Sequence, residues 1–214
     1  MKIDLRGKRV WLTGASRGLG RALALELTSA GARVALSARD GALLEEVAAA
    51  CKAIGGNVVV VEVDVTDAAA CVRAAEEIVA ELGGIDILVA NAGISMWTPF
   101  NEIEDPAIFE KLMQVNYLGV VYCVRAALPY LCASVQLPGG VIVNISSLQA
   151  WTGMPVHTGY GASKAAVQIF LDSLRMEMPK LHVLGVYPGW ISGTSLRASA
   201  LGADGNALGA SRKS

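Results

Sequence analysis

Short apolar runs rich in β-branched residues alternate along the chain with longer segments in which apolar residues recur at helical spacing. The first pattern predicts buried strands, and the second predicts amphipathic helices. Strands are expected at 8–13, 33–38, 57–63, 85–90, 141–145 and 182–187. Helices are expected at 21–30, 41–54, from about 66 to 82, 106–131 and 159–178.

The order of these elements indicates the fold class. Up to residue 90, strands and helices alternate with short links, which implies an α/β protein in three layers, with a parallel sheet covered by helices on both faces. One domain is expected over 1–196, because 214 residues fit a single core and no linker divides them. Residues 197–214 lack periodicity, so we expect an irregular substrate lid or a truncated C-terminus there.

Composition and charge argue against several classes of function. The net charge of −1 does not favour a nucleic-acid partner. No apolar run looks long enough and free enough of charge to span a membrane, and no signal peptide is visible, so a cytoplasmic protein is expected. The two histidines and four cysteines lack metal-ligand spacing, so no metal site is expected. The cysteines, expected to be buried free thiols, are Cys51, Cys71, Cys123 and Cys132.

A glycine-rich turn, TGASRGLG at 13–20, separates the first strand from the first helix. Such a turn lets the backbone approach a diphosphate and places that anion at a helix N-terminus, where free N–H groups favour it. A tight connection without any ligand would also use glycines, so the turn alone does not decide. The residues predicted to bind a nucleotide here are Gly14, Ser16, Arg17, Gly18, Leu19 and Gly20.

The end of the second strand distinguishes between nucleotides. An acidic residue there would bind the ribose 2′-hydroxyl of NAD, but this chain has Ala38 followed by Arg39. The guanidinium groups of Arg17 and Arg39 suit a 2′-phosphate, so NADP(H) is expected. Asp40, one residue later, keeps NAD(H) as the alternative, and both arginines have the alternative of being ordinary surface residues.

The strand at 141–145 ends in Ser146 and Ser147, and the helix that follows carries Tyr160 and Lys164 on one face, four residues apart. A Tyr phenol has a reference pKa of about 10, and a neighbouring ammonium is expected to lower that pKa toward the working range. Together these groups would polarise a carbonyl and exchange a proton with it. An amphipathic surface pair is the alternative for Tyr160 and Lys164 alone.

Ser147, Tyr160, Ser163 and Lys164 match the Ser…Tyr-x-x-Ser-Lys motif of the short-chain dehydrogenase/reductases (SDRs), and the chain resembles this family from Gly7 to about Leu196. The TGxxxGxG turn is similar to that of its compact single-domain branch. Residues 145–196 look most like the SDR family member 7-type branch, near the 11β-hydroxysteroid dehydrogenase-like enzymes. The resemblance implies a doubly wound Rossmann fold and an oxidoreductase that transfers hydride between a nicotinamide and a carbonyl or secondary alcohol.

The resemblance also implies a role for each residue of the site. Tyr160 would be the acid/base, and Lys164 would lower its pKa and bind the nicotinamide ribose. Ser147, with Ser146 as its alternate, would bind the substrate oxygen. Asn116 would hold a water that links Lys164 to solvent, although a mid-helix Asn is usually just locally bonded. The further cofactor contacts implied are Asp64, Val65, Asn91, Ala92, Gly93, Pro188, Gly189, Ile191 and Thr194, with Ser192 as a rival of Thr194.

Asp64 has the plainer alternative of capping the helix that follows, as Thr66 or Asp67 would. The substrate is expected to be a hydrophobic ketone or alcohol, because apolar and aromatic residues are predicted near the mouth of the site. These residues are Met96, Trp97, Gln149, Trp151, Met154, His157 and Trp190, with loop packing or subunit contacts as their alternative role.

Two other functions are alternatives. One is a catalytically silent nucleotide-binding regulator or a truncated inactive form, which the retention of Ser147, Tyr160 and Lys164 argues against and the short C-terminus argues for. The other is an epimerase or dehydratase of the extended branch, which would need a larger substrate domain. Family members form homodimers or homotetramers, so the resemblance implies a homo-oligomer. They also normally continue with another helix and a seventh strand, and neither pattern is visible in 197–214.

Overall fold

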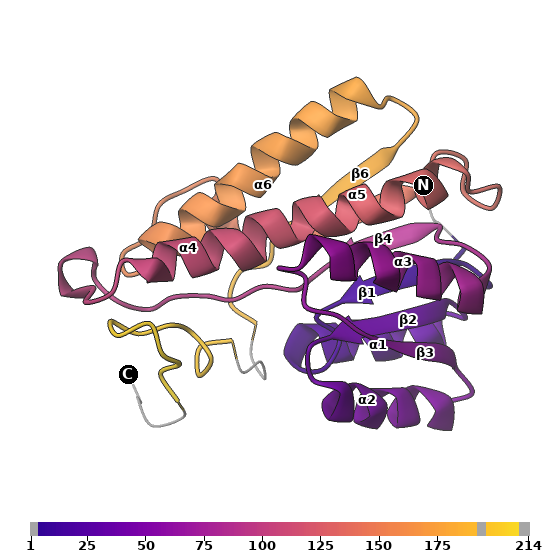
Figure 1. The fold of residues 1–214 in the computed structure, drawn as a ribbon, viewed down its shortest axis with the longest axis horizontal. Coiled ribbons are helices and arrows are strands. Elements are labelled where there is room, and N and C mark those ends of the chain that lie inside the picture. Colours follow the sequence, from indigo (N-terminus) through magenta and orange to yellow (C-terminus); the bar gives the residue numbers. More distant parts are fainter. Residues whose placement is uncertain (1–3, 192–195, 210–214) are drawn as a thin grey trace.

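The structure, a computed structural model, describes residues 4–191 and 196–209. Six parallel strands form one sheet in the order β3-β2-β1-β4-β5-β6 (Figure 1). The strands are β1 (Arg9–Thr13), β2 (Arg33–Ala38), β3 (Asn57–Glu62), β4 (Ile87–Ala90), β5 (Val141–Ile145) and β6 (His182–Val186). The α-helices are α1 (Gly18–Ser29), α2 (Gly41–Ala53), α3 (Ala68–Leu82), α4 (Ala107–Met113), α5 (Gly119–Cys132) and α6 (Thr158–Glu177).

Helices cover both faces of the sheet, so the predicted three-layer α/β Rossmann fold is confirmed. On one face, α1 and α2 pack around Leu12, Leu36 and Leu44. On the other face, α3, α5 and α6 pack around a second core that includes Trp11 and Leu88. Figure 1 shows these two groups of helices on opposite sides of the strands. Strand alternation decides the division, because successive side chains point to opposite faces.

The strand order reverses between β1 and β4. From β1 the chain builds outward through β2 to β3, and then returns to place β4 on the other side of β1. In an open parallel sheet, the crevice outside the carboxyl ends at such a reversal is where ligands bind. The topology therefore places the loops after β1, β4 and β5 around one crevice.

The predicted helix at 106–131 is interrupted. It consists of α4 and α5 joined by a π-helical turn, η2 (Gln114–Leu118). Pro129, expected to bend or end this helix, lies within α5 and three residues before its end. The stretch Ala107–Cys132 is also long and apolar enough to cross a membrane, so the expectation that no run has this property is wrong by length and composition. Here it packs against α3 and α6 as a core helix, which accounts for its apolar composition.

Residues 196–209 form no helix or strand, and a lid or truncated end over 197–214 remains a prediction. They fold back against the loop that follows β4 (Figure 1). Leu201 N–H donates to the carbonyl of Ser95 at 2.8 Å, and Trp97 N–H donates to the carbonyl of Leu201 at 2.9 Å. Leu201 also packs into a small apolar cluster with Met96 and Ile108. This part of the segment is therefore held by backbone pairing.

Three of the four cysteines are buried free thiols as predicted, but Cys132 is exposed because it occupies the last position of α5. Cys71 and Cys123 meet across the interface of α3 and α5, with their sulfur atoms 3.8 Å apart.

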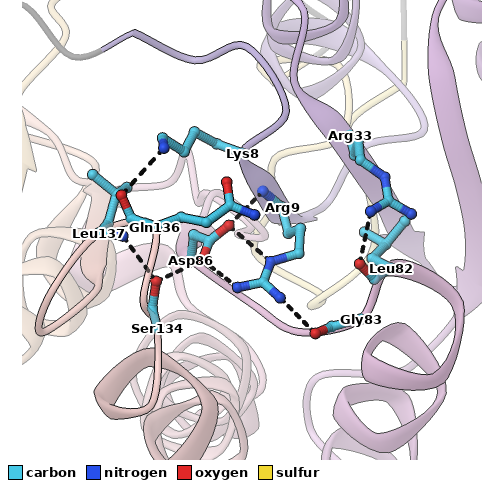
Figure 2. Close-up of polar contacts among 9 residues, drawn as sticks. All are labelled: Lys8, Arg9, Arg33, Leu82, Gly83, Asp86, Ser134, Gln136 and Leu137. Atoms are coloured by element: carbon cyan, nitrogen blue, oxygen red, sulfur yellow. Dashed lines mark hydrogen bonds and ion pairs between the residues drawn. The ribbon is translucent and has the colours of Figure 1, made fainter.

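An ion pair is buried at the amino end of the sheet (Figure 2). Arg9 Nη2 lies 2.6 Å from Asp86 Oδ1, and both Arg9 Nε and Arg9 N–H donate to Asp86 Oδ2 at 2.9 Å. Ser134 Oγ donates to Asp86 Oδ1 at 2.6 Å and accepts Leu137 N–H. The Asp86 side chain is fully buried, and the Arg9 side chain is 13% exposed. One carboxylate therefore joins β1, the start of β4 and the loop after α5.

Replacing Asp86 by Ala should destabilise the fold by about 3–5 kcal/mol, because the guanidinium of Arg9 is left largely buried without its partner. Burial alone would raise the pKa of Asp86, but hydrogen bonds from Arg9 and Ser134 outweigh it and hold that pKa below its usual value. The contribution of Asp86 is thus present at neutral pH and is lost as the pH falls below about 4.

Urea unfolding of wild type and Asp86→Ala at pH 7 and pH 3 measures both effects. The control is Asp4→Ala, which removes the exposed pair of Asp4 with Arg6 and should leave stability unchanged. Equal stability of Asp86→Ala and wild type at pH 7 would contradict the role assigned to this pair.

Candidate active site

The glycine-rich turn after β1 lies against the loop after β4. Gly14 has φ +65°, and a Cβ on it would stand 2.8 Å from the Cα of Ala92. A Cβ on Gly20 would stand 2.0 Å from the carbonyl oxygen of Gly14. Both positions therefore require glycine, one for its conformation and both for their close contacts. These contacts show a tight connection, which the sequence left as the alternative, and binding of a diphosphate by this turn remains a prediction.

Helix α1 begins at Gly18, three residues earlier than predicted, so the turn forms the start of the helix. Arg17 is its N-cap residue and makes no side-chain hydrogen bond to the first turn. The first backbone N–H groups of α1 are thus not capped by that side chain, as a bound anion requires. The glycine cradle and this helix end together fit the diphosphate of a dinucleotide.

Thr13 and Asn91 hold the two loops together. Thr13 Oγ1 accepts the N–H groups of Asn91 and Ala92 at 3.0 and 3.1 Å. Asn91 Nδ2 donates to the carbonyls of Thr13 and Gly14 at 2.9 and 3.1 Å. Asn91 therefore supports the nucleotide turn, while Thr13 is a site residue that the sequence analysis missed. The position of Thr13 as the last residue of β1, directly before Gly14, is the sequence feature that could have indicated its role.

Asn116 lies in the π-helical turn η2 and is fully buried. Its Oδ1 accepts Ile94 N–H at 2.9 Å, and its Nδ2 donates to the carbonyl of Ile94 and to Ser163 Oγ, both at 2.9 Å. Ser163 Oγ in turn donates to the carbonyl of Tyr160 at 2.7 Å. Asn116 thus joins the loop after β4 to the helix that carries Tyr160, and both protons of its amide group are engaged.

Ser147, Tyr160 and Lys164 lie together at the carboxyl end of β5. The Ser147 hydroxyl lies close enough to Tyr160 to act on the pKa of its phenol, and Ser147 Oγ accepts Gln149 N–H at 3.2 Å. Lys164 Nζ donates to the carbonyl of Ile145 at 3.0 Å and lies 5.8 Å from the centre of the Tyr160 ring. All three side chains are buried. Ser146, the alternate to Ser147, is buried beside them, and its Oγ has no hydrogen-bond partner in the described part of the chain.

The pKa values of Tyr160 and Lys164 differ from those expected from the sequence. Burial raises the pKa of Tyr160, and the nearby Ser147 hydroxyl only partly opposes it. Burial also lowers the pKa of Lys164 from 10.5 to about 8. The expected lowering of the Tyr160 pKa by Lys164 is therefore not observed, because the ammonium is directed to the carbonyl of Ile145 and the phenol is itself desolvated.

Four charged residues lie near the end of β2. Arg17 and Asp40 form an exposed ion pair at 3.2 Å, and Asp40 also caps α2 by accepting Leu43 N–H. Both carboxylate oxygens of Asp40 are therefore engaged. Arg39 is exposed. Glu62, at the end of β3, reaches the same edge, because a Cβ on Gly41 would stand 2.6 Å from its Oε2. No local sequence pattern indicates this carboxylate, because only the pairing of β2 with β3 brings Glu62 near the end of β2.

The remaining predicted contacts vary in their surroundings. Asp64 does not cap α3; Asp67 does, while Asp64 Oδ1 accepts from Thr66. Gly93 is exposed next to Lys164, because a Cβ there would stand 3.6 Å from Nζ. Val65 is buried, Pro188 is partly buried, and Gly189 and Ile191 are exposed after β6. Thr194 and its rival Ser192 lie outside the described residues.

Aromatic rings line the approach to Tyr160. The His157 ring lies 4.9 Å from Trp97 and 6.1 Å from Tyr160, and Trp190 packs 5.7 Å from Trp97. Trp190 is 72% exposed and Trp151 is 64% exposed, as expected of a mouth. Met154 is also exposed, and Gln149 is partly buried. The placement of Met96 at the mouth was wrong, because it is fully buried and its sulfur accepts Gly159 N–H.

Comparison with known proteins adds an independent finding. A model of the short chain dehydrogenase family matches residues 8–203. The chain belongs to this family. It is 41% identical over 190 residues to 11-beta-hydroxysteroid dehydrogenase 1A of Arabidopsis thaliana, covering 88% of this chain and 53% of that protein. It is 36% identical over 217 residues to Dehydrogenase/reductase SDR family member 7B of Bos taurus, covering 98% and 65%.

Solved structures of family members share the fold. An SDR from Burkholderia phymatum in complex with NAD is 26% identical, with a TM-score of 0.85 over 92% of this chain and 70% of that one. An alcohol dehydrogenase from Thermococcus sibiricus complexed with 5-hydroxy-NADP is 29% identical, with a TM-score of 0.81 over 86% and 77%. The first of these structures holds NAD, and the second holds 5-hydroxy-NADP. The chain spans between 53% and 65% of the length of the two curated relatives above.

Lys164→Met should make the fold more stable at pH 7. A pKa lowered from 10.5 to about 8 means that the buried charge costs roughly 3 kcal/mol at neutral pH. Between about pH 8 and pH 10 the unfolded chain binds more protons than the folded one, so wild-type stability rises with pH there. The advantage of the variant, on the order of 2 kcal/mol after loss of the bond to Ile145, should shrink toward pH 10.

Denaturant unfolding at pH 7 and pH 10 tests this difference, with Lys180→Met as the control at an exposed lysine. A constant difference between wild type and Lys164→Met at both pH values would show that Lys164 is not destabilised by burial.

Proposed function

We propose that the chain is an NADP-dependent oxidoreductase that interconverts a carbonyl and a secondary alcohol on a hydrophobic small molecule. The observation that carries the proposal is that the Ser147 hydroxyl, the Tyr160 phenol and the buried amine of Lys164 lie together at the carboxyl end of β5. A phenol, a hydroxyl donor and a buried cation gathered at one point are what proton exchange with a carbonyl oxygen requires. The family to which the chain belongs supports this chemistry.

Tyr160 donates the proton that the substrate oxygen gains on reduction and takes it back on oxidation. Ser147 orients that oxygen: its Oγ already accepts Gln149 N–H, so its own proton is available for donation. Lys164, whose ammonium donates to the carbonyl of Ile145 beside the Tyr160 ring, would bind the nicotinamide ribose. Asn116 acts as a positioning residue through Ile94 and Ser163, and the water it was expected to hold remains a prediction.

Residues of this chain also suit the cofactor. The diphosphate would lie on the glycine turn and the N-terminus of α1, and the adenosine near Asp64 and Val65. The nicotinamide end would lie between Gly93, Lys164 and the Pro188-Gly189 turn. When bound, a nicotinamide dinucleotide supplies or accepts the hydride. The aromatic approach formed by Trp97, Trp151 and Trp190 favours an apolar or ring-containing substrate.

The expected homo-oligomer and cytoplasmic location remain predictions. Ile169 and Met176, on the outer face of α6, are 68% and 77% exposed, which supports an apolar contact with a second copy of the chain.

Tyr160→Phe should lower the rate of NADPH-dependent ketone reduction by about 10²- to 10⁴-fold, because the ring is kept and only the proton donor is removed. Steady-state kinetics on a panel of aryl and alicyclic ketones measures turnover, and calorimetry measures NADPH binding, which should be unchanged. Full activity of Tyr160→Phe would exclude Tyr160 as the acid. Tight NADPH binding by wild type without turnover of any ketone would favour the catalytically silent regulator.

Arg39→Ala should weaken NADPH binding by about tenfold or more and leave NADH binding nearly unchanged, since a charge-assisted contact to the 2′-phosphate is lost. Asp40 supports this preference, because Arg17 and Leu43 already engage both of its oxygens. Calorimetric titration with each nucleotide gives the ratio, and Arg125→Ala on the exposed face of α5 is the control. A preference for NADH in wild type would instead assign the ribose 2′-hydroxyl to Asp40 or Glu62.

A further inference from the structure

His157 is a buried titratable side chain that the mechanism above does not use. It precedes α6 directly and is 5% exposed. Its ring packs edge-on against Trp97 and lies 6.1 Å from the Tyr160 ring and 6.3 Å from the Trp190 ring. The imidazole is therefore a polar group set within an otherwise aromatic wall, next to the acid of the site.

The backbone determines which nitrogen of His157 carries the proton. Nδ1 lies 2.9 Å from the carbonyl oxygen of Pro155. A carbonyl only accepts hydrogen bonds, so the proton of the neutral ring is on Nδ1 and the lone pair is on Nε2. The two nitrogens point in diverging directions, which turns Nε2 away from Pro155. Among the described residues no hydrogen-bond donor to Nε2 is found, and Nε2 is not one of the buried polar atoms that lack a partner, so this nitrogen is accessible to a ligand or to water.

The segment before His157 is strained. Val156 has φ +63°, and within the described part of the chain it is the only non-glycine residue with a positive φ. A β-branched residue rarely adopts this conformation, and it persists only where surrounding contacts enforce it. Thr98 N–H donates to the Val156 carbonyl at 3.0 Å and holds the turn against the loop that carries Trp97. Contacts with the Trp97 loop thus hold Val156 in a backbone conformation that it would not otherwise prefer, and this fixes the position of the adjacent His157.

We propose that His157 is a specificity-determining residue whose Nε2 accepts a hydrogen bond from a donor that the substrate carries beside its reacting carbon. This inference rests on the proposed function and narrows its substrate class to hydroxyketones and the corresponding diols. Tyr160 contacts the reacting oxygen, and the separation of the two rings suits a donor on the adjacent carbon. A substrate that covers Nε2 without supplying that donor would leave the acceptor unpaired, and sites built in this way discriminate strongly against such a substrate.

A matched pair of ketones tests the assignment. The kcat/KM of NADPH-dependent reduction is measured for 2-hydroxyacetophenone and for acetophenone, and their ratio is compared between variants. Because the hydroxyl also alters intrinsic reactivity, the readout is the change in the ratio. His157→Phe should lower the ratio at least tenfold relative to wild type. His182→Phe, at the exposed second histidine on β6, is the control and should keep the wild-type ratio. An unchanged ratio in His157→Phe overturns the proposal.

A second measurement does not depend on the folding of that variant. Nitrogen-15 NMR of the labelled wild-type chain with NADP⁺ contains two imidazoles, and His182→Phe identifies the signals of each. The His157 ring should carry its proton on Nδ1, and 2-hydroxyacetophenone, but not acetophenone, should shift its Nε2 signal. A proton on Nε2, or equal shifts with both ketones, overturns the proposal. Absence of turnover with every ketone would contradict the proposed function, while the NMR result would still decide the role of His157.

Discussion

The hydrogen bonds between Thr13 and the Asn91-Ala92 pair hold the sheet together at its point of reversal. There β1 and β4 end side by side, and every other part of the candidate site is placed relative to them. The glycine turn lies against Ala92 because Gly14 has no side chain. The loop that continues from Ala92 is hydrogen-bonded to the Asn116 side chain. Asn116 also donates to Ser163 Oγ, and Ser163 Oγ donates to the carbonyl of Tyr160, so the helix that carries Tyr160 is positioned relative to this loop. The site thus depends on a chain of polar contacts more than on any one element.

Much of this fold and of the candidate site could be predicted from patterns among residues close together in the sequence. Runs such as 141–145 are apolar on both faces because both faces of the sheet are covered, and the glycines of 14–20 report close backbone contacts that any fold with this turn would need. The grouping of Ser147, Tyr160 and Lys164 followed from a strand end and a four-residue helical spacing. Tertiary contacts decided the rest. Arg9 and Asp86 are 77 positions apart, and strand pairing alone brings Glu62 to the end of β2. Met96 is buried against Ile108, Leu112 and Tyr160, which lie on α4 and α6. The residues next to Met96 in the sequence do not indicate this burial.

The carboxyl end of the sheet contains features that destabilise the fold, and the contacts that stabilise it lie elsewhere. Lys164 is ionised in a buried environment, Ser146 Oγ is left without a partner in the described chain, and Val156 is held in a strained conformation. Each of these features lies within the loops or the helix that form the site. The opposite end of the sheet carries the well-satisfied contacts of Asp86, and the two apolar cores lie between. Such a division is common where a functional site requires groups that folding alone would not favour.

The π-helical turn at 114–118 makes the length of this helix as important as its composition. A π turn accommodates one more residue than the α-helix does, and one residue rotates everything downstream by about 100°. Deleting a single residue there would relax η2 to ordinary α-helical geometry and keep Cys123 and Val124 against α3, because the π turn already holds the extra residue. A deletion elsewhere in α4 or α5 would instead rotate the downstream face away from α3. The π turn is therefore the one place where this helix can change its length by one residue without disturbing its packing.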